Sequence, residues 1–140
     1  MFSPLRIAFT LAAALILVMD MLPLIRGQSA QAATSQQAVE KGVKLLMVER
    51  QGCIHCAAFR RDIAPGYGAS AQGRQAPLVA IDIDGPWPDG LALGTAPYLT
   101  PTFILLRDGV EVSRILGYPG ADRFYPMLSR IMQETGVAAK

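Results

Sequence analysis

Two cysteines, Cys53 and Cys56, are the residues whose types and spacing most clearly indicate chemistry, and they are the only cysteines in the chain. A thiolate is the species that attacks a disulfide, and a second thiol nearby can resolve the mixed disulfide that results. A bridge that closes so short a ring constrains little of the chain, which makes a purely structural disulfide the weaker interpretation. The spacing therefore predicts a pair that exchanges thiols and disulfides.

The order of the two cysteines assigns their roles. The segment that begins at Cys53, CIHCAAFRRDIA, reads as a helix, and free N–H groups and the helix dipole favour a thiolate at a helix N-terminus. Cys53 is therefore predicted to attack, and Cys56, one turn later, to resolve. His55 lies between them and would stabilise the thiolate as an imidazolium, or it is simply a solvent-facing residue.

Other chemistries of this motif fit the sequence less well. Covalent haem attachment requires a histidine directly after the second cysteine, where Ala57 stands. A zinc site lacks further ligands because His55 is the only histidine, so no metal or cofactor is expected. Binding of Cu(I) by the two thiolates stays open, which makes a metallochaperone the main alternative function. A dithiol oxidant that forms disulfides is another.

The N-terminal residues 1–33 read as an export signal. Arg6 supplies a positive start, Ile7–Met19 is an apolar run interrupted only by Thr10, and Ala30-Gln31-Ala32 offers a cleavage site of small residues. An uncleaved membrane anchor over Ile7–Ile25 is the alternative, because that stretch is long enough to span a bilayer. Both interpretations place the rest of the chain outside the cytoplasm.

Residues 34–140 have the length of one domain. Thirteen basic and eleven acidic residues are scattered through the chain, so nucleic acid is not an expected partner. In the first half, the local patterns predict a helix over Thr34–Lys41, a strand over Lys44–Glu49, a helix from Cys53 to the break at Pro65, and a strand over Ala76–Ile83. A loop over Gly85–Leu99 follows, with at most one short helix around Leu91. In the second half, the patterns predict strands over Thr102–Leu106 and Glu111–Leu116, joined by an Asp108-Gly109 hairpin, and a helix over Ala121–Glu134.

This order predicts an α/β domain with a mixed four-stranded sheet. The helix between the first two strands makes them parallel, and the hairpin makes the second half antiparallel, giving βαβ followed by ββα with flanking helices. The apolar residues on one side of the cysteine-bearing helix are assigned to the core, as are the two methionines Met47 and Met127. On that helix these residues are Ile54, Ala57, Ala58 and Ile63.

Over residues 36–134 the arrangement resembles the thioredoxin fold. The resemblance depends on the Cys-x-x-Cys motif after the first strand together with Thr100-Pro101 before the hairpin, where that fold holds a cis proline beside the cysteines. A proline also suits the first residue of a strand, because it cannot donate to the ladder.

Two positions depart from the usual thioredoxin pattern. Gly52 replaces the aromatic residue before the first cysteine, and Met47 replaces the buried acid, with Glu49 two positions further on. The usual route for protons therefore cannot be transferred to this chain.

Longer blocks resemble the small exported thioredoxins of bacterial sulfur-oxidation clusters, the SoxS type. The matching blocks are MVERQGCIHC, RRDIAPGYGASAQGRQAPL, PWP, TPTF and ILGYPG. This resemblance implies attacking Cys53, resolving Cys56 and cis-proline Pro101, with Thr100 and Gly117 beside the groove where a partner docks. It also implies a periplasmic protein, expected to be a monomer. In that family the dithiol keeps the reactive cysteine of the SoxYZ carrier in its working state and draws electrons through a membrane thiol transporter.

Overall fold

The sheet is built around β1 (Val43–Glu49), whose central residues Leu45 to Val48 are all buried. The parallel neighbour of β1 is β2 (Leu78–Asp82), and its antiparallel neighbour is β3 (Thr102–Arg107). The hairpin partner of β3 is β4 (Val110–Leu116), which gives the order β2-β1-β3-β4. The computed structural model describes residues 39–137. The predicted α/β class with a mixed four-stranded sheet is confirmed.

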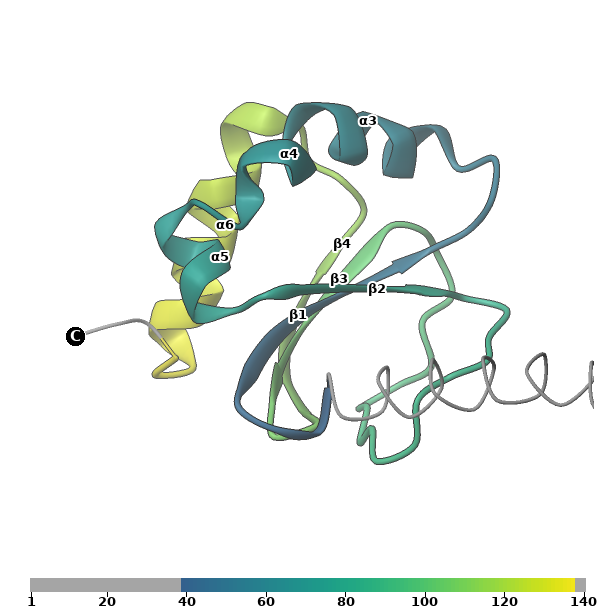
Figure 1. Ribbon diagram of the computed structural model, residues 1–140, viewed down its shortest axis with the longest axis vertical. Helices are drawn as coiled ribbons and strands as arrows, with labels where there is room; N and C mark the ends of the chain where they lie inside the picture. Colours follow the sequence, from purple (N-terminus) through teal and green to yellow (C-terminus); the bar gives the residue numbers. More distant parts are fainter. Residues whose placement is uncertain (1–38, 138–140) are drawn as a thin grey trace, which may run out of the picture. The chain divides into compact units, whose positions relative to one another are not determined.

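The helices of this part of the chain gather on one face of the sheet (Figure 1). They are α3 (Ile54–Asp62), α4 (Ala64–Tyr67), α5 (Ala71–Gln75) and α6 (Ala121–Glu134). Beneath them three rings pack together, with centroids 4.6 Å apart for Phe59 and Phe103 and 5.0 Å apart for Phe103 and Phe124. These rings hold α3 and α6 on the sheet.

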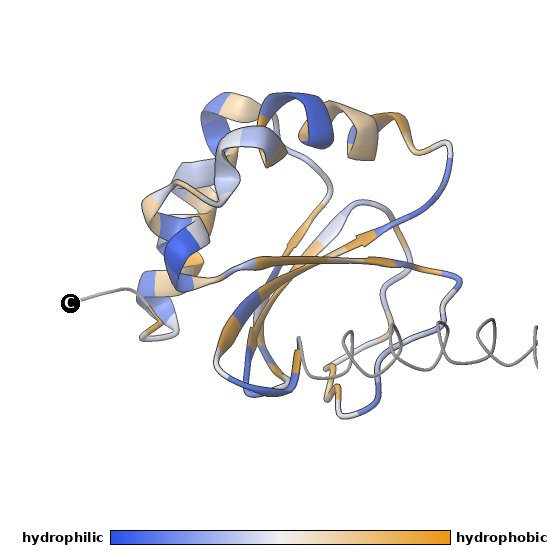
Figure 2. Ribbon diagram, in the orientation of Figure 1, coloured by the Kyte–Doolittle hydropathy of each residue, from blue (hydrophilic) through white to orange (hydrophobic). Residues whose placement is uncertain are grey.

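Alternation along β1 separates two cores. Leu45 and Met47 point to the helical face, whereas Leu46 and Val48 point to the other face, as expected for successive residues of a strand. Among the described residues, the second face is covered by the segment between β2 and β3, residues 83–101, and by the buried Val39, which is helical. Its apolar cover comes from Trp87, Leu91 and Leu93. Figure 2 shows the strands as mostly hydrophobic ribbons, in keeping with a sheet buried on both faces.

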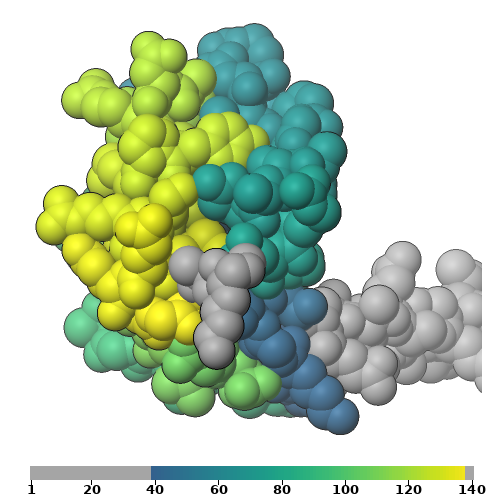
Figure 3. Space-filling view, turned by 90° about the vertical axis from the view of Figure 1, so that its left-hand side faces the viewer, coloured from purple at the N-terminus to yellow at the C-terminus, as the bar shows by residue number. Residues whose placement is uncertain are grey.

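A tight corner joins α4 to α5. The buried Tyr67 hydroxyl donates to the Ala76 carbonyl at 2.8 Å, and the Ser70 side chain caps α5 by accepting from the Gly73 N–H at 2.9 Å. Gln72 donates to the Ser129 hydroxyl of α6 at 2.7 Å. Figure 3 shows the yellow surface of α6 against the teal surface of this corner.

Several predicted boundaries differ from those observed. The helix that begins after Cys53 ends before Pro65, as predicted, but the chain continues as α4, with Pro65 in its first turn, where a missing N–H costs nothing. The helix α5 was not predicted. Around Leu91 there is no helix; instead Ala92 forms a bridge with Val110. Of the helix predicted over Thr34–Lys41, residues 39 and 40 are helical, and residues 34–38 lie outside the described part.

Three core assignments are wrong. Ile54 is 75% exposed and Ala57 is exposed as well, because α3 buries Cys56 and Phe59 and turns Ile54 and Ala57 to solvent. Met127 is 40% exposed, because α6 buries its Phe124 and Leu128 face instead. Met47 is buried as predicted.

Candidate active site

A disulfide joins Cys53 to Cys56 where β1 passes into α3. The link between β1 and α3 is a tight turn over residues 50–53, in which the Cys53 N–H donates to the Arg50 carbonyl at 3.2 Å. Gly52 occupies the third position of this turn with a φ of +77°, a conformation that glycine adopts without steric cost. The turn brings Cys53 to the start of the helix.

Cys53 is the N-cap of α3. Its Sγ accepts a hydrogen bond from the Cys56 N–H at 3.1 Å, so a free N–H of the first turn points at this sulfur. Cys53 is partly exposed, whereas Cys56 is 3% exposed and packs with Phe59 in the helical core. A thiolate at Cys53 would thus be accessible and stabilised by the helix N-terminus.

Thr100, Pro101 and Gly117 lie on the β3 side of this junction. Because Thr102 pairs with Val48 and with Leu116, the residues before β3 and after β4 lie at the same end of the sheet as the C-terminus of β1. The Gly117 N–H donates to the Pro101 carbonyl at 2.8 Å. The Thr100–Pro101 peptide bond is cis, and so is the Gly85–Pro86 bond, which was not predicted.

Tyr118 connects this side to the cysteine helix. Its ring packs edge-on against Phe59 of α3, with 5.8 Å between the centroids. It belongs, with Cys53, to the partly buried residues around the helical core. Gly117, the residue before it, is partly exposed, and a Cβ there would meet no atom within 4 Å. The backbone on this side of the junction is therefore open to an approaching chain.

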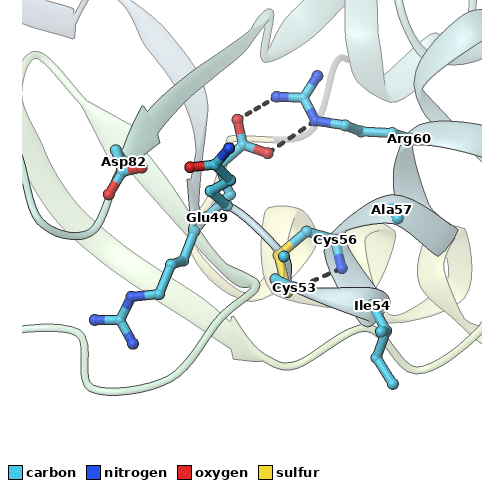
Figure 4. Close-up of a pocket in the computed structure, with 10 residues that line it drawn as sticks. Glu49, Cys53, Ile54, Cys56, Ala57, Arg60 and Asp82 are labelled. Atoms are coloured by element: carbon cyan, nitrogen blue, oxygen red, sulfur yellow. Dashed lines mark hydrogen bonds and ion pairs between the residues drawn. A yellow bond between two sulfur atoms is a disulfide. The ribbon is translucent and has the colours of Figure 1, made fainter.

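A charged groove of about 470 Å³ lies on the β2 side of the disulfide. Glu49 at the end of β1 forms an ion pair with Arg60 of α3, and Figure 4 shows this pair beside the disulfide. Asp82 of β2, the register partner of Glu49, lies on the opposite wall. The residues that line the groove are Glu49, Arg50, Gln51, Gly52, Cys53, Ile54, Cys56, Ala57, Arg60 and Asp82. The sequence analysis missed this pair; its signal was the shared strand face of Met47 and Glu49.

His55 is exposed and lies outside the residues that line this groove. Its predicted influence on the thiolate stays a prediction. Within residues 39–137 no three His, Cys, Asp or Glu side chains come together as a metal site. The same residues include no helix long and apolar enough to cross a membrane.

The chain is similar to solved thioredoxin structures. It is 42% identical to the periplasmic thioredoxin SoxS from Paracoccus pantotrophus in its reduced form, with a TM-score of 0.64, and the match covers 69% of this chain and 99% of that one. It is 16% identical to thioredoxin from Aeropyrum pernix, with a TM-score of 0.50 and coverage of 71% and 82%, which supports the fold alone.

No protein-family model and no curated protein matches the chain. The similarity to SoxS, however, extends over almost the whole of that protein, and the disulfide occupies the Cys-x-x-Cys motif at the start of α3. The chain therefore belongs to the SoxS family of thioredoxins, and it is a thiol–disulfide oxidoreductase.

Proposed function

We propose that this protein reduces disulfides or mixed disulfides on the reactive cysteine of an exported carrier protein of bacterial sulfur oxidation, the SoxYZ complex. The observation that carries the proposal is the unequal setting of the two sulfurs. Cys53 caps a helix and is partly exposed, whereas Cys56 is 3% exposed behind it. The similarity to SoxS supports the choice of pathway.

In this reaction Cys53 is the nucleophile and Cys56 the resolving thiol. The Cys53 thiolate attacks a sulfur of the partner's disulfide, and one partner thiolate leaves. Cys56, as a thiolate, then attacks Cys53, closes the intramolecular disulfide and releases the second partner thiolate. The partner gains two electrons and the protein loses two. A membrane thiol transporter, itself a dithiol, returns them by the same exchange.

The partner docks as an extended segment against Thr100, Pro101 and Gly117. Thr100 precedes β3 and offers backbone groups for strand addition, a mode that gives affinity through main-chain hydrogen bonds. Two large apolar side chains stand at this side, since Tyr98 is 73% exposed and Leu116 is 49% exposed. A segment laid along this edge brings its cysteine to Cys53.

The proposal places the protein in the periplasm, with residues 1–33 removed as an export signal or retained as an anchor. These residues lie outside the described part of the chain, and the SoxS neighbour from Paracoccus pantotrophus is periplasmic. N-terminal sequencing of the protein recovered from a periplasmic extract distinguishes cleavage before Ala33 from retention.

Trapping of the mixed disulfide tests the proposed partner. In a sulfur-oxidising host, the Cys56→Ser variant attacks but cannot resolve, so it accumulates a covalent complex with its partner. The matched control carries both Cys53→Ser and Cys56→Ser and should trap nothing. Complexes are separated, reduced and identified by mass spectrometry. Recovery of SoxYZ supports the proposal, whereas recovery of only copper-assembly or cytochrome-maturation proteins would overturn the pathway.

A further inference from the structure

Arg60 lies one helical turn beyond Cys56 on α3. Residues four positions apart share a helix face, with Cβ atoms about 5–6 Å apart. Helical side chains also lean toward the N-terminus of their helix, so the Arg60 side chain leans toward Cys56. Both residues line the groove beside the disulfide. A permanent positive charge is therefore held near the two sulfurs.

Glu49 supplies the opposite charge from the strand beneath. It follows Leu45 and Met47 on the face of β1 that α3 covers, and its side chain is 20% exposed. The Arg60 Nε donates to its Oε2 at 2.8 Å, and the Arg60 Nη2 contacts its Oε1. This pairing raises the pKa of Arg60. Figure 4 shows carboxylate and guanidinium facing each other beside the Cys53–Cys56 bridge.

Among the charges that line the groove, the Glu49 carboxylate is the most confined, with a side chain 20% exposed, whereas the side chain of its partner Arg60 is 53% exposed. Asp82 is exposed on the far wall, and Arg50 pairs with Asp84 at 3.0 Å where both side chains are more than half exposed. Solvent and salt screen exposed charges strongly, and they screen partly buried ones less. On the β3 side the residue beyond Thr102 is Pro101, which carries no charge. Glu49 is thus the least screened charge of the groove, and Arg60 is the cation that pairs with it one helical turn beyond Cys56.

Charge near a dithiol changes its reduction equilibrium in a known direction. A positive charge stabilises a thiolate, which exists only in the reduced form, and so makes the disulfide easier to reduce. A negative charge does the opposite and makes the dithiol a stronger reductant. In an ion pair the two influences oppose each other, so removal of either partner leaves the other unbalanced.

We propose that the Glu49–Arg60 ion pair sets the redox potential of the Cys53–Cys56 pair, with the carboxylate favouring the disulfide and the guanidinium favouring the dithiol. This inference deepens the proposed exchange function and rests on it. Both residues act on the sulfurs electrostatically and not as reacting groups, so they are not catalytic residues. The usual thioredoxin pattern has a buried acid where this chain has the uncharged Met47. Here the charge that influences the cysteine pair comes instead from Glu49, two positions further along β1.

Equilibration with glutathione tests the inference. The protein disulfide plus two glutathione thiols gives the dithiol plus glutathione disulfide, so atoms and electrons balance. Glu49→Gln should shift the equilibrium toward the dithiol by about threefold or more, and Arg60→Gln should shift it toward the disulfide by a similar factor. The double variant should lie between the two. Alkylation of Cys53 as a function of pH should move to lower pH in Glu49→Gln and to higher pH in Arg60→Gln.

Glu134→Gln is the matched control, because it breaks the Arg130–Glu134 pair of α6, neither of whose residues lines the groove, and it should leave the equilibrium constant unchanged. Thermal unfolding of each variant identifies any loss of structure, which would shift both single variants in the same direction. Shifts of opposite sign support the inference. Shifts of the same sign, or none, overturn it. Failure of the unaltered protein to equilibrate with glutathione would instead overturn the proposed exchange function.

Discussion

The chain turns sharply at two places on the helical side of the sheet, and the two turns are packed in opposite ways. At the redox turn, residues 50–53, a Cβ added to Gly52 would meet no atom within 4 Å. At the α4–α5 corner, a Cβ added to Gly73 would lie 1.9 Å from the Tyr67 carbonyl oxygen. One turn is open around a reactive bond, and the other is closed around a buried hydroxyl.

The difference shows that this fold separates chemistry from stability. The redox turn leaves the Cys53 sulfur within reach of a partner and surrounds it with charges that water can also reach. The corner instead buries Tyr67 and ties α5 to α6 through Gln72 and Ser129. Substitutions at the corner should therefore reduce stability with little effect on exchange, and substitutions at the redox turn should do the reverse.

Gly73→Ala should give the largest loss of stability. The new methyl group would overlap backbone that cannot move without displacing Tyr67, so we expect a loss of roughly 3 kcal/mol in the free energy of unfolding. Urea denaturation measures this loss. The folded fraction should still exchange disulfides at the normal rate; a loss of exchange with normal stability would contradict the separation of the two regions.

Tyr67→Phe tests the buried hydrogen bond of the corner. The change removes the donor to the Ala76 carbonyl and leaves that acceptor buried, so we expect a loss of about 1.5 kcal/mol. The partly exposed Tyr125, whose ring stacks on Tyr67 at a centroid distance of 6.5 Å, offers a control in Tyr125→Phe. If both variants lost the same free energy of unfolding in denaturant, the hydrogen bond from the Tyr67 hydroxyl to the Ala76 carbonyl would not be a specific source of stability.

Gly52→Ala should cost less than Gly73→Ala, because its only penalty is conformational. A φ of +77° is unfavourable for alanine by about 1 kcal/mol, and there is open space for the methyl group. Both glycine variants should be compared by urea denaturation under the same conditions. A cost at Gly52 that equals or exceeds the cost at Gly73 would reverse the comparison of the two turns.

Low pH should reduce the free energy of unfolding through the Glu111–Arg114 pair of β4, which lies outside both turns, and this effect should be the smallest of the four. The hydrogen bond from Arg114 lowers the pKa of Glu111 below its usual 4.5, although burial opposes this. Because the folded pKa is the lower one, this pair stabilises the fold above pH 4.5 and loses that contribution as the pH falls through the folded pKa. Glu111→Gln should flatten the acid side of the stability profile by less than about 1 kcal/mol; an unchanged profile would contradict this assignment.

The sequence was informative where local signals agree with the fold. The buried run of β1, the Asp108-Gly109 hairpin and the spacing of Phe124 and Leu128 predicted four elements, β1, β3, β4 and α6, within about a residue of their observed ends. The cysteine pair was found because its spacing is itself the chemical signal. Each of these features depends on residues close together in the chain.

The parts that were missed depend on distant contacts. The corner is held by a hydroxyl that reaches Ala76, nine residues away, although Ser70 three residues before Gly73 was an available capping signal for α5. The pairing of Glu49 with Arg60 joins a strand to a helix, and the strand face that Glu49 shares with Met47 did not indicate which cation would meet it. Ile54 was misassigned because apolar spacing alone does not show which side of a short helix meets the sheet.

Alkylation of the reduced protein tests the central claim most directly. A brief reaction with a small alkylating reagent at low concentration, mapped by mass spectrometry, shows which sulfur is the accessible thiolate. We predict modification of Cys53 first, because its sulfur caps α3 while Cys56 is 3% exposed. Modification of Cys56 first would contradict the assigned roles of both cysteines and the mechanism based on them.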